Sequence, residues 1–138
     1  MYKKVKLAGI ISTLILSASA YSAEMTVGFS QIGSESGWRA AETSVAKSEA
    51  QKRGITLKIA DAQQKQENQI KAIRSFIAQG VDIIAFVPIV ETGWDTVLKE
   101  AKDAKIPVVV VDRDVKVSDD SLYVAKIGTD SVTEGKNV

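Results

Sequence analysis

The stretch Val108-Val-Val-Val-Asp112-Arg113 decides the fold, because it joins four β-branched residues directly to an acid and a base. Such an apolar run predicts a strand that is buried on both faces, and strands of this kind belong to parallel sheets covered by helices. In open α/β sheets, ligands bind outside the carboxyl ends of the strands. The sequence therefore predicts that Asp112 and Arg113 lie where a small ligand would bind.

Asp112 and Arg113 suit a ligand that is rich in hydroxyl groups. A carboxylate accepts hydrogen bonds, and a guanidinium offers five donors in a planar fork. The two side chains therefore favour a neutral polar molecule such as a sugar. A second interpretation is an ion pair at the strand end that only joins neighbouring loops.

The chain as a whole alternates between strand and helix patterns, and Gly54 and Gly80 are expected to end two of the helices. Trp94 falls on the apolar stripe of the third helix, where we expect it to be a core residue. The stripe of the first helix consists of Trp38, Ala41, Val45 and Ala46. We expect strands at residues 26–30, 55–59, 83–87, 108–111 and 122–127, and helices at 37–52, 66–79, 93–104 and from Asp130 onward. This order predicts an α/β fold with a doubly wound, mostly parallel sheet and helices on both faces.

The N-terminal 22 residues predict a secretory signal peptide. Three lysines at positions 3, 4 and 6 precede an apolar run over residues 7–16, and small residues follow it over 17–23. This order is typical of a cleaved export signal, and the run is shorter than the roughly 20 residues that span a bilayer. We expect a signal peptide at 1–22, with cleavage between Ala20 and Ala23, and an exported domain at 23–138. An uncleaved membrane anchor is the alternative.

Composition excludes several classes of function. The 138 residues are 45% apolar and 25% charged, as in a soluble globular domain. The formal net charge is +1, and loss of the three N-terminal lysines would make it −2, which leaves no basic stripe for nucleic acid. The chain has no Cys and no His, so the usual nucleophilic triads and nearly all zinc sites are excluded. We therefore expect a binding protein without a cofactor or metal rather than an enzyme.

Polar loops follow each of the first four predicted strands, and a parallel sheet would bring these loops to one rim. Their residues are 31–39, then Asp61 with Gln63 and Gln64, then 88–92, and finally Asp112 with Arg113. Convergence of the four loops favours a ligand site more strongly than any single loop does.

The first of these loops resembles a phosphate-binding loop only in its glycines. Gly28 and Gly33 have the required spacing, but Ser34 and Glu35 stand where Lys and Ser or Thr are needed. Because an acid at this position would repel phosphate, we expect no nucleotide site.

Other side chains of the same loop each have a binding and a structural interpretation. Ser34 or Ser36 contacts the ligand or caps the first helix, and Glu35 accepts ligand hydroxyls or complements the helix dipole. Trp38 offers a flat apolar face to a sugar ring or anchors the helix in the core. Arg39 donates to the ligand or orients Glu35.

Several segments resemble periplasmic sugar-binding proteins of the ribose/galactose-binding type, which are the soluble receptors of ABC importers. These segments are residues 27–42, 53–61 and 63–72, the turn at 79–82, and residues 104–108 before the Asp-Arg strand. The similarity covers about residues 25 to 130 and is strongest to members that bind galactofuranose. It implies the type I periplasmic-binding-protein fold. It also implies that Glu35, Ser36, Gly37, Trp38 and Arg39 form a first sugar-contact loop, with Asp112 and Arg113 as a second contact pair.

The resemblance further implies a function and partners. A member of this family binds a monosaccharide, here expected to be galactofuranose, in the periplasm and delivers it as a monomer to the permease of an ABC importer. Such proteins have two lobes and about twice this length, so we expect the second lobe to be missing here. A small α/β enzyme acting on a sugar is the alternative function, disfavoured by the lack of His, Cys and a phosphate loop. A sugar-sensing repressor is set aside because the signal peptide stands where a DNA-binding domain would be.

Overall fold

The computed structural model describes residues 24–129 and 131–136. The expected signal peptide at 1–22, its cleavage between Ala20 and Ala23, and Asp130 as the start of the last helix lie outside these residues. Within the described part of the chain, no helix has both the length and the apolar character needed to cross a membrane.

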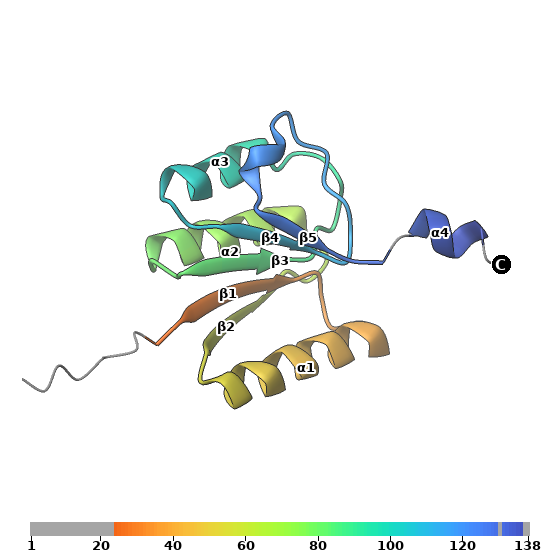
Figure 1. Cartoon of the computed structure of the whole chain (residues 1–138), viewed down its shortest axis with the longest axis horizontal. Helices are drawn as coiled ribbons and strands as arrows, with labels where there is room; N and C mark the ends of the chain where they lie inside the picture. Colours follow the sequence, from red (N-terminus) through yellow and green to blue (C-terminus); the bar gives the residue numbers. More distant parts are fainter. Residues whose placement is uncertain (1–23, 130, 137–138) are drawn as a thin grey trace, which may run out of the picture.

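A parallel sheet of five strands forms the centre of the fold (Figure 1). The strands are β1 (Thr26–Gln31), β2 (Thr56–Asp61), β3 (Ile83–Phe86), β4 (Val108–Val111) and β5 (Ala125–Ile127). Their order across the sheet is β2-β1-β3-β4-β5, and every neighbouring pair is parallel. This arrangement confirms the predicted α/β fold class.

Helices cover both faces of the sheet (Figure 1). The helical elements are α1 (Gly37–Arg53), α2 (Gln66–Ala78), α3 (Asp95–Asp103), the short 3-10 helix η1 (Asp120–Leu122) and α4 (Ser131–Lys136). Helices α2 and α3 lie together on one face, and α1 lies on the other.

Several expected boundaries differ from the structure by one to three residues, and two of these differences have a clear physical cause. The third helix begins at Asp95 instead of Gly93, because Gly93 has a φ of 87°, which no α-helix accommodates. The fifth strand begins at Ala125 instead of Leu122, because the Asp119 side chain accepts a hydrogen bond from the backbone N–H of Ser121 and caps η1 there.

The face under α2 and α3 holds the main core. Phe86 of β3 and Val110 of β4 are fully buried there together with Trp94, and the rings of Phe86 and Trp94 are 4.9 Å apart. The Trp94 indole N–H donates to the carbonyl oxygen of Val90 at 2.8 Å, so its one polar atom is also satisfied. The prediction that Trp94 is a core residue is confirmed.

The face under α1 is covered less completely. Val109 and Val111 of β4 are only partly buried, and Ile127 of β5 is exposed. Helix α1 lies over the outer strand β2, so its inner side carries Ala46 and Ala50. The rest of the predicted stripe, Trp38, Ala41 and Val45, is exposed. The interpretation of Trp38 as a core anchor was therefore wrong.

Gly28 has a packing role that explains its place in β1. A Cβ atom at this position would lie 2.5 Å from the Phe76 ring of α2, closer than any real contact allows. Gly28, which has the spacing of a phosphate-loop glycine, therefore allows α2 to pack closely against the sheet.

Candidate functional site

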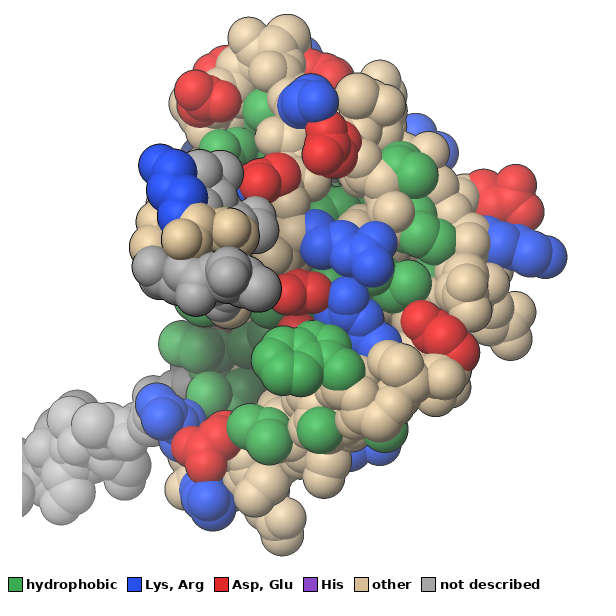
Figure 2. All heavy atoms as spheres, turned by 90° about the vertical axis from the view of Figure 1, so that its right-hand side faces the viewer, with side chains coloured by type: hydrophobic (Ala, Val, Ile, Leu, Met, Phe, Trp, Pro, Cys, Tyr) green, Lys and Arg blue, Asp and Glu red, His purple; other side chains and the backbone are tan. Residues whose placement is uncertain are grey.

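A pocket of about 550 Å³ opens at the rim formed by the segments that follow β3, β4 and β5, with Arg39 of α1 beside them. We call it the rim pocket. Figure 2 shows this side of the molecule, with basic and acidic side chains next to each other near its centre and hydrophobic side chains beside them. The lining residues are Arg39, Pro88, Ile89, Val90, Glu91, Asp112, Arg113, Asp114 and Thr129.

Arg39 and Asp112 form the central ion pair of the rim pocket. Arg39 Nη2 lies 2.8 Å from Asp112 Oδ2, and Arg39 Nη1 lies 3.0 Å from Glu42 Oε2. The Arg39 side chain is only 7% exposed. Burial alone would lower the pKa of Arg39, but hydrogen bonds and charge from Asp112 and Glu42 outweigh burial and raise it above its usual value. The guanidinium is therefore a fixed positive charge between two carboxylates.

This geometry corrects the expectation that Arg39 orients Glu35. Arg39 leaves the first turn of α1 on the side that faces the sheet and is buried, whereas Glu35 precedes the helix and is exposed. The side chain of Arg39 therefore reaches the end of β4 and not the preceding loop.

Asp112 and Arg113 do not pair with each other. The ion-pair partner of Asp112 is Arg39, which comes from a distant helix. Arg113 is exposed, and its Nη1 donates to the carbonyl oxygen of Ile89 at 3.4 Å. Among the described residues, no further acceptor is found for Arg113 and no partner is found for Asp112 Oδ1. Both groups thus keep hydrogen-bonding capacity for a ligand.

The backbone at Asp112 is held in an unusual conformation. Its φ is 66°, in the left-handed region that L-residues other than Asn and Asp rarely adopt. Its N–H donates to the carbonyl oxygen of Ile127 at 2.7 Å, and a Cβ atom on Gly128 would lie 2.8 Å from the Asp112 carbonyl oxygen. Gly128 is therefore needed for β5 to end this close to Asp112. Strain of this kind is common at binding sites.

The first-loop residues lie outside the rim pocket, with the exception of Arg39. Ser36 caps α1, since its Oγ accepts a hydrogen bond from the backbone N–H of Arg39 at 3.2 Å. The structure thus supports the capping interpretation of Ser36. Glu35, Gly37 and Trp38 are exposed beside the helix start, and none of them lines the pocket.

Sequence analysis missed Glu42, Gln31 and Gly128. Glu42 follows Arg39 by one helical turn, a spacing that permits an ion pair. Gln31 ends β1 and is 2% exposed, and its Nε2 donates to Glu42 Oε2 at 2.8 Å. The spacing of Glu42 was a usable signal, whereas the role of Gln31 depends on how α1 packs beside the end of β1, and that of Gly128 on the approach of two strand ends.

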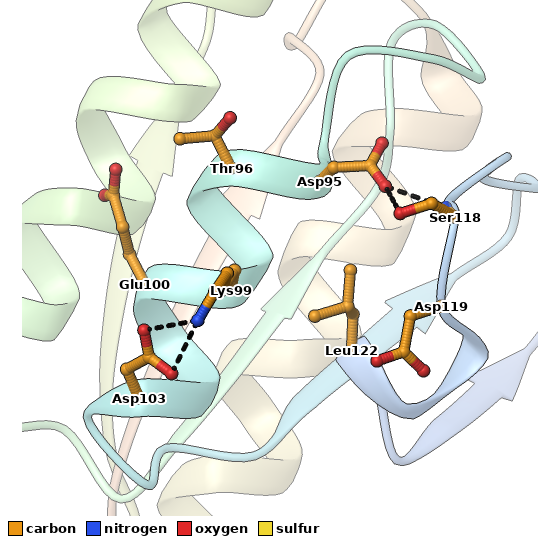
Figure 3. Close-up of a pocket in the computed structure, with 8 residues that line it drawn as sticks. All are labelled: Asp95, Thr96, Lys99, Glu100, Asp103, Ser118, Asp119 and Leu122. Carbon is orange, nitrogen blue, oxygen red and sulfur yellow. Dashed lines mark hydrogen bonds and ion pairs between the residues drawn. The ribbon is translucent and has the colours of Figure 1, made fainter.

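A second pocket of about 390 Å³ lies between α3 and the segment before η1 (Figure 3). Asp95 accepts hydrogen bonds there from the backbone N–H and the hydroxyl of Ser118, and these lower the pKa of Asp95. Lys99 pairs with Asp103 at 2.9 Å. The contact between Asp95 and Ser118 attaches the loop to α3, whereas Lys99 and Asp103 pair within the helix. Within residues 24–129 and 131–136, no cluster of three or more acidic, Cys or His side chains is placed to hold a metal ion.

Comparison with known proteins agrees with the sequence resemblance. Residues 27–138 match the family model for the periplasmic binding protein domain. The chain is 62% identical over 136 residues to the galactofuranose-binding protein YtfQ of Escherichia coli, and the match covers 99% of this chain and 42% of that protein. The chain therefore spans less than half the length of this relative.

Solved structures are similar over the same region. The crystal structure of a galactofuranose binding protein matches with a TM-score of 0.80 and 70% identity, over 82% of this chain and 38% of that one. The periplasmic binding protein of the arabinose ABC transporter from Shewanella, bound to α- and β-L-arabinofuranose, matches with a TM-score of 0.79 and 68% identity. That match covers 80% of this chain and 37% of the other.

The buried ion pair yields a prediction about stability. Arg39→Ala would leave the carboxylates of Asp112 and Glu42 desolvated and without a counter-charge. We expect the free energy of unfolding to fall by about 2 kcal/mol at neutral pH, less than for a fully buried pair because both acids keep some contact with solvent. Urea denaturation of the protein measures this loss. Arg53→Ala is the matched control, since it removes an exposed pair with Glu49 on the same helix and should change little.

Proposed function

Because this chain belongs to the periplasmic binding protein domain family, we propose that it is the first lobe of an exported receptor that binds a furanose sugar for an ABC importer. The observation that carries this proposal is the hydrogen-bonding capacity that Asp112 and Arg113 keep in the rim pocket. One carboxylate oxygen of Asp112 is fixed by Arg39, while the other carboxylate oxygen and most donors of Arg113 have no described partner.

These groups provide complementary contacts to a polyhydroxylated ring. Asp112 Oδ1 accepts a hydrogen bond from a sugar hydroxyl, and Arg113 donates to a hydroxyl or ring oxygen. Pro88, Ile89 and Val90 supply apolar surface for the carbon-bound hydrogens of the ring. A pocket of this size and mixed character is typical of a small-molecule site.

The first-loop residues complete the proposed site from its edge. Glu35, Ser36, Gly37 and Trp38 precede or begin α1, next to Arg39. The Trp38 ring is 65% exposed and has no role in the core of the described lobe. Such an exposed indole is suited to stacking on a sugar that enters the pocket. We propose that a second lobe of the full-length receptor forms the opposite wall.

An enzyme acting on a sugar is not favoured. The related proteins named above are binding proteins, and the described residues that line the rim pocket include no nucleophile paired with a general base.

The proposed ligand predicts which ring form is bound. We expect the full-length protein, mixed with isotope-labelled D-galactose, to bind the furanose form selectively, as judged by NMR of the bound sugar. D-Ribose should bind at least ~10-fold more weakly, a difference of about 1.4 kcal/mol. Calorimetry with both sugars measures this ratio. A bound pyranose, or equal affinity for ribose, would contradict the proposal for furanose recognition.

Export is part of the proposal and has its own test. The basic, apolar and small-residue segments occur in the order that signal peptidase requires. We propose a signal peptide at 1–22 and a periplasmic domain from 23 onward. Mass spectrometry of periplasmic protein should find a mature N-terminus generated between Ala20 and Ala23. A cytoplasmic product that retains Met1 would be incompatible with export.

A further inference from the structure

Glu42 and Gln31 connect the rim pocket to the interior of the fold. Gln31 Nε2 lies 2.8 Å from Glu42 Oε2, and the same carboxylate oxygen lies 3.0 Å from Arg39 Nη1. Arg39 in turn binds Asp112 at 2.8 Å. This chain of contacts joins the end of β1, the first turns of α1 and the end of β4. Neither Glu42 nor Gln31 lines the rim pocket.

We propose that Glu42 is a positioning residue for the sugar site: it fixes the Arg39 guanidinium, which in turn fixes the Asp112 carboxylate. The inference rests on the proposed sugar-binding function. Glu42 acts through Arg39 and Asp112 and does not touch the sugar.

The geometry explains why a second carboxylate is needed. An Arg side chain has several rotatable bonds, and a single ion pair with Asp112 would leave the guanidinium plane free to turn. Glu42 engages the other terminal nitrogen, so the plane is held at two points. Gln31 fixes Glu42 in turn, because its Oε1 accepts from the backbone N–H of Ile32 at 2.8 Å while its Nε2 donates to Glu42. With Arg39 fixed, one oxygen of Asp112 is engaged, and the other has no partner in the described part of the chain.

The charges support the same role. Arg39 neutralises one of its two carboxylate partners, so the three side chains together carry one negative charge. That charge is partly desolvated, since the side chains of Glu42 and Asp112 are 19% and 22% exposed. A partly desolvated acid with a free oxygen forms strong hydrogen bonds to hydroxyl donors.

Glu42→Ala tests the inference in the full-length protein, with D-galactose and L-arabinose as probes. We expect an affinity ~10-fold lower for both sugars, because Asp112 loses its fixed orientation. Glu42→Gln should recover most of the affinity, since an amide oxygen can still accept from Arg39. The matched control is Glu49→Ala on the same helix, whose exposed carboxylate pairs only with Lys52 and Arg53 and whose loss should leave affinity unchanged.

A double-mutant cycle separates positioning from simple stabilisation. If Glu42 acts through Asp112, Glu42→Ala should change affinity by less than ~2-fold in an Asp112→Asn background. NMR titration extends the measurement to weak binding. An undiminished effect of Glu42→Ala in that background, or an unchanged affinity of the folded single variant, would overturn the inference. Should Glu42→Ala fail to fold, Gln31→Leu removes the contact that fixes Glu42 and should lower affinity ~3-fold or more.

The measurements distinguish a failure of the proposed sugar-binding function from a failure of the positioning role of Glu42. If the parent protein binds neither sugar, the receptor proposal itself is wrong and the positioning role is excluded with it. If the parent binds and Glu42→Ala binds equally well, only the positioning role is wrong.

Discussion

The ion pair between Arg39 and Asp112 is the constraint on which the rim of this fold depends. It joins the first turn of α1 to the residue after β4, two parts of the chain that the sheet alone does not connect. Asp112 is held at the same time through its backbone, by the hydrogen bond to Ile127 and the close approach of Gly128. The ion pair and these backbone contacts together therefore fix the position of the Asp112 carboxylate at the rim.

The charges around the rim pocket are nearly all engaged in pairs. Lys116 pairs with Glu91 at 2.5 Å, and Lys126 pairs with Asp114. Arg39 forms ion pairs with both Asp112 and Glu42. Arg113 has only the carbonyl of Ile89 as a described partner. A pocket with such balanced charge favours a neutral ligand with many hydroxyl groups over a strongly charged one.

The fold could be predicted from sequence because local periodicity determines each strand and helix, as in the four valines of β4 and the stripe that buries Trp94. The rim location of Asp112 and Arg113 followed from the parallel topology. The partner of Asp112 could not be predicted, because it depends on how α1 is rotated over the sheet. The same rotation exposes Trp38 and Val45, which periodicity alone assigned to an apolar stripe. The role of Gly128 could not be predicted, because it depends on how closely the end of β5 approaches Asp112 after β4.

The sugar affinity of Asp112→Asn in the full-length receptor decides whether Asp112 is a sugar-binding carboxylate that Arg39 holds in place. Removal of one partner of a desolvated charged hydrogen bond costs about 2–5 kcal/mol, so D-galactose should bind ~30-fold more weakly or worse. The thermal midpoint should change little, since Glu42 still neutralises Arg39. A folded Asp112→Asn variant with the parent's affinity would contradict the account and leave the ion pair as a contact that only joins two loops.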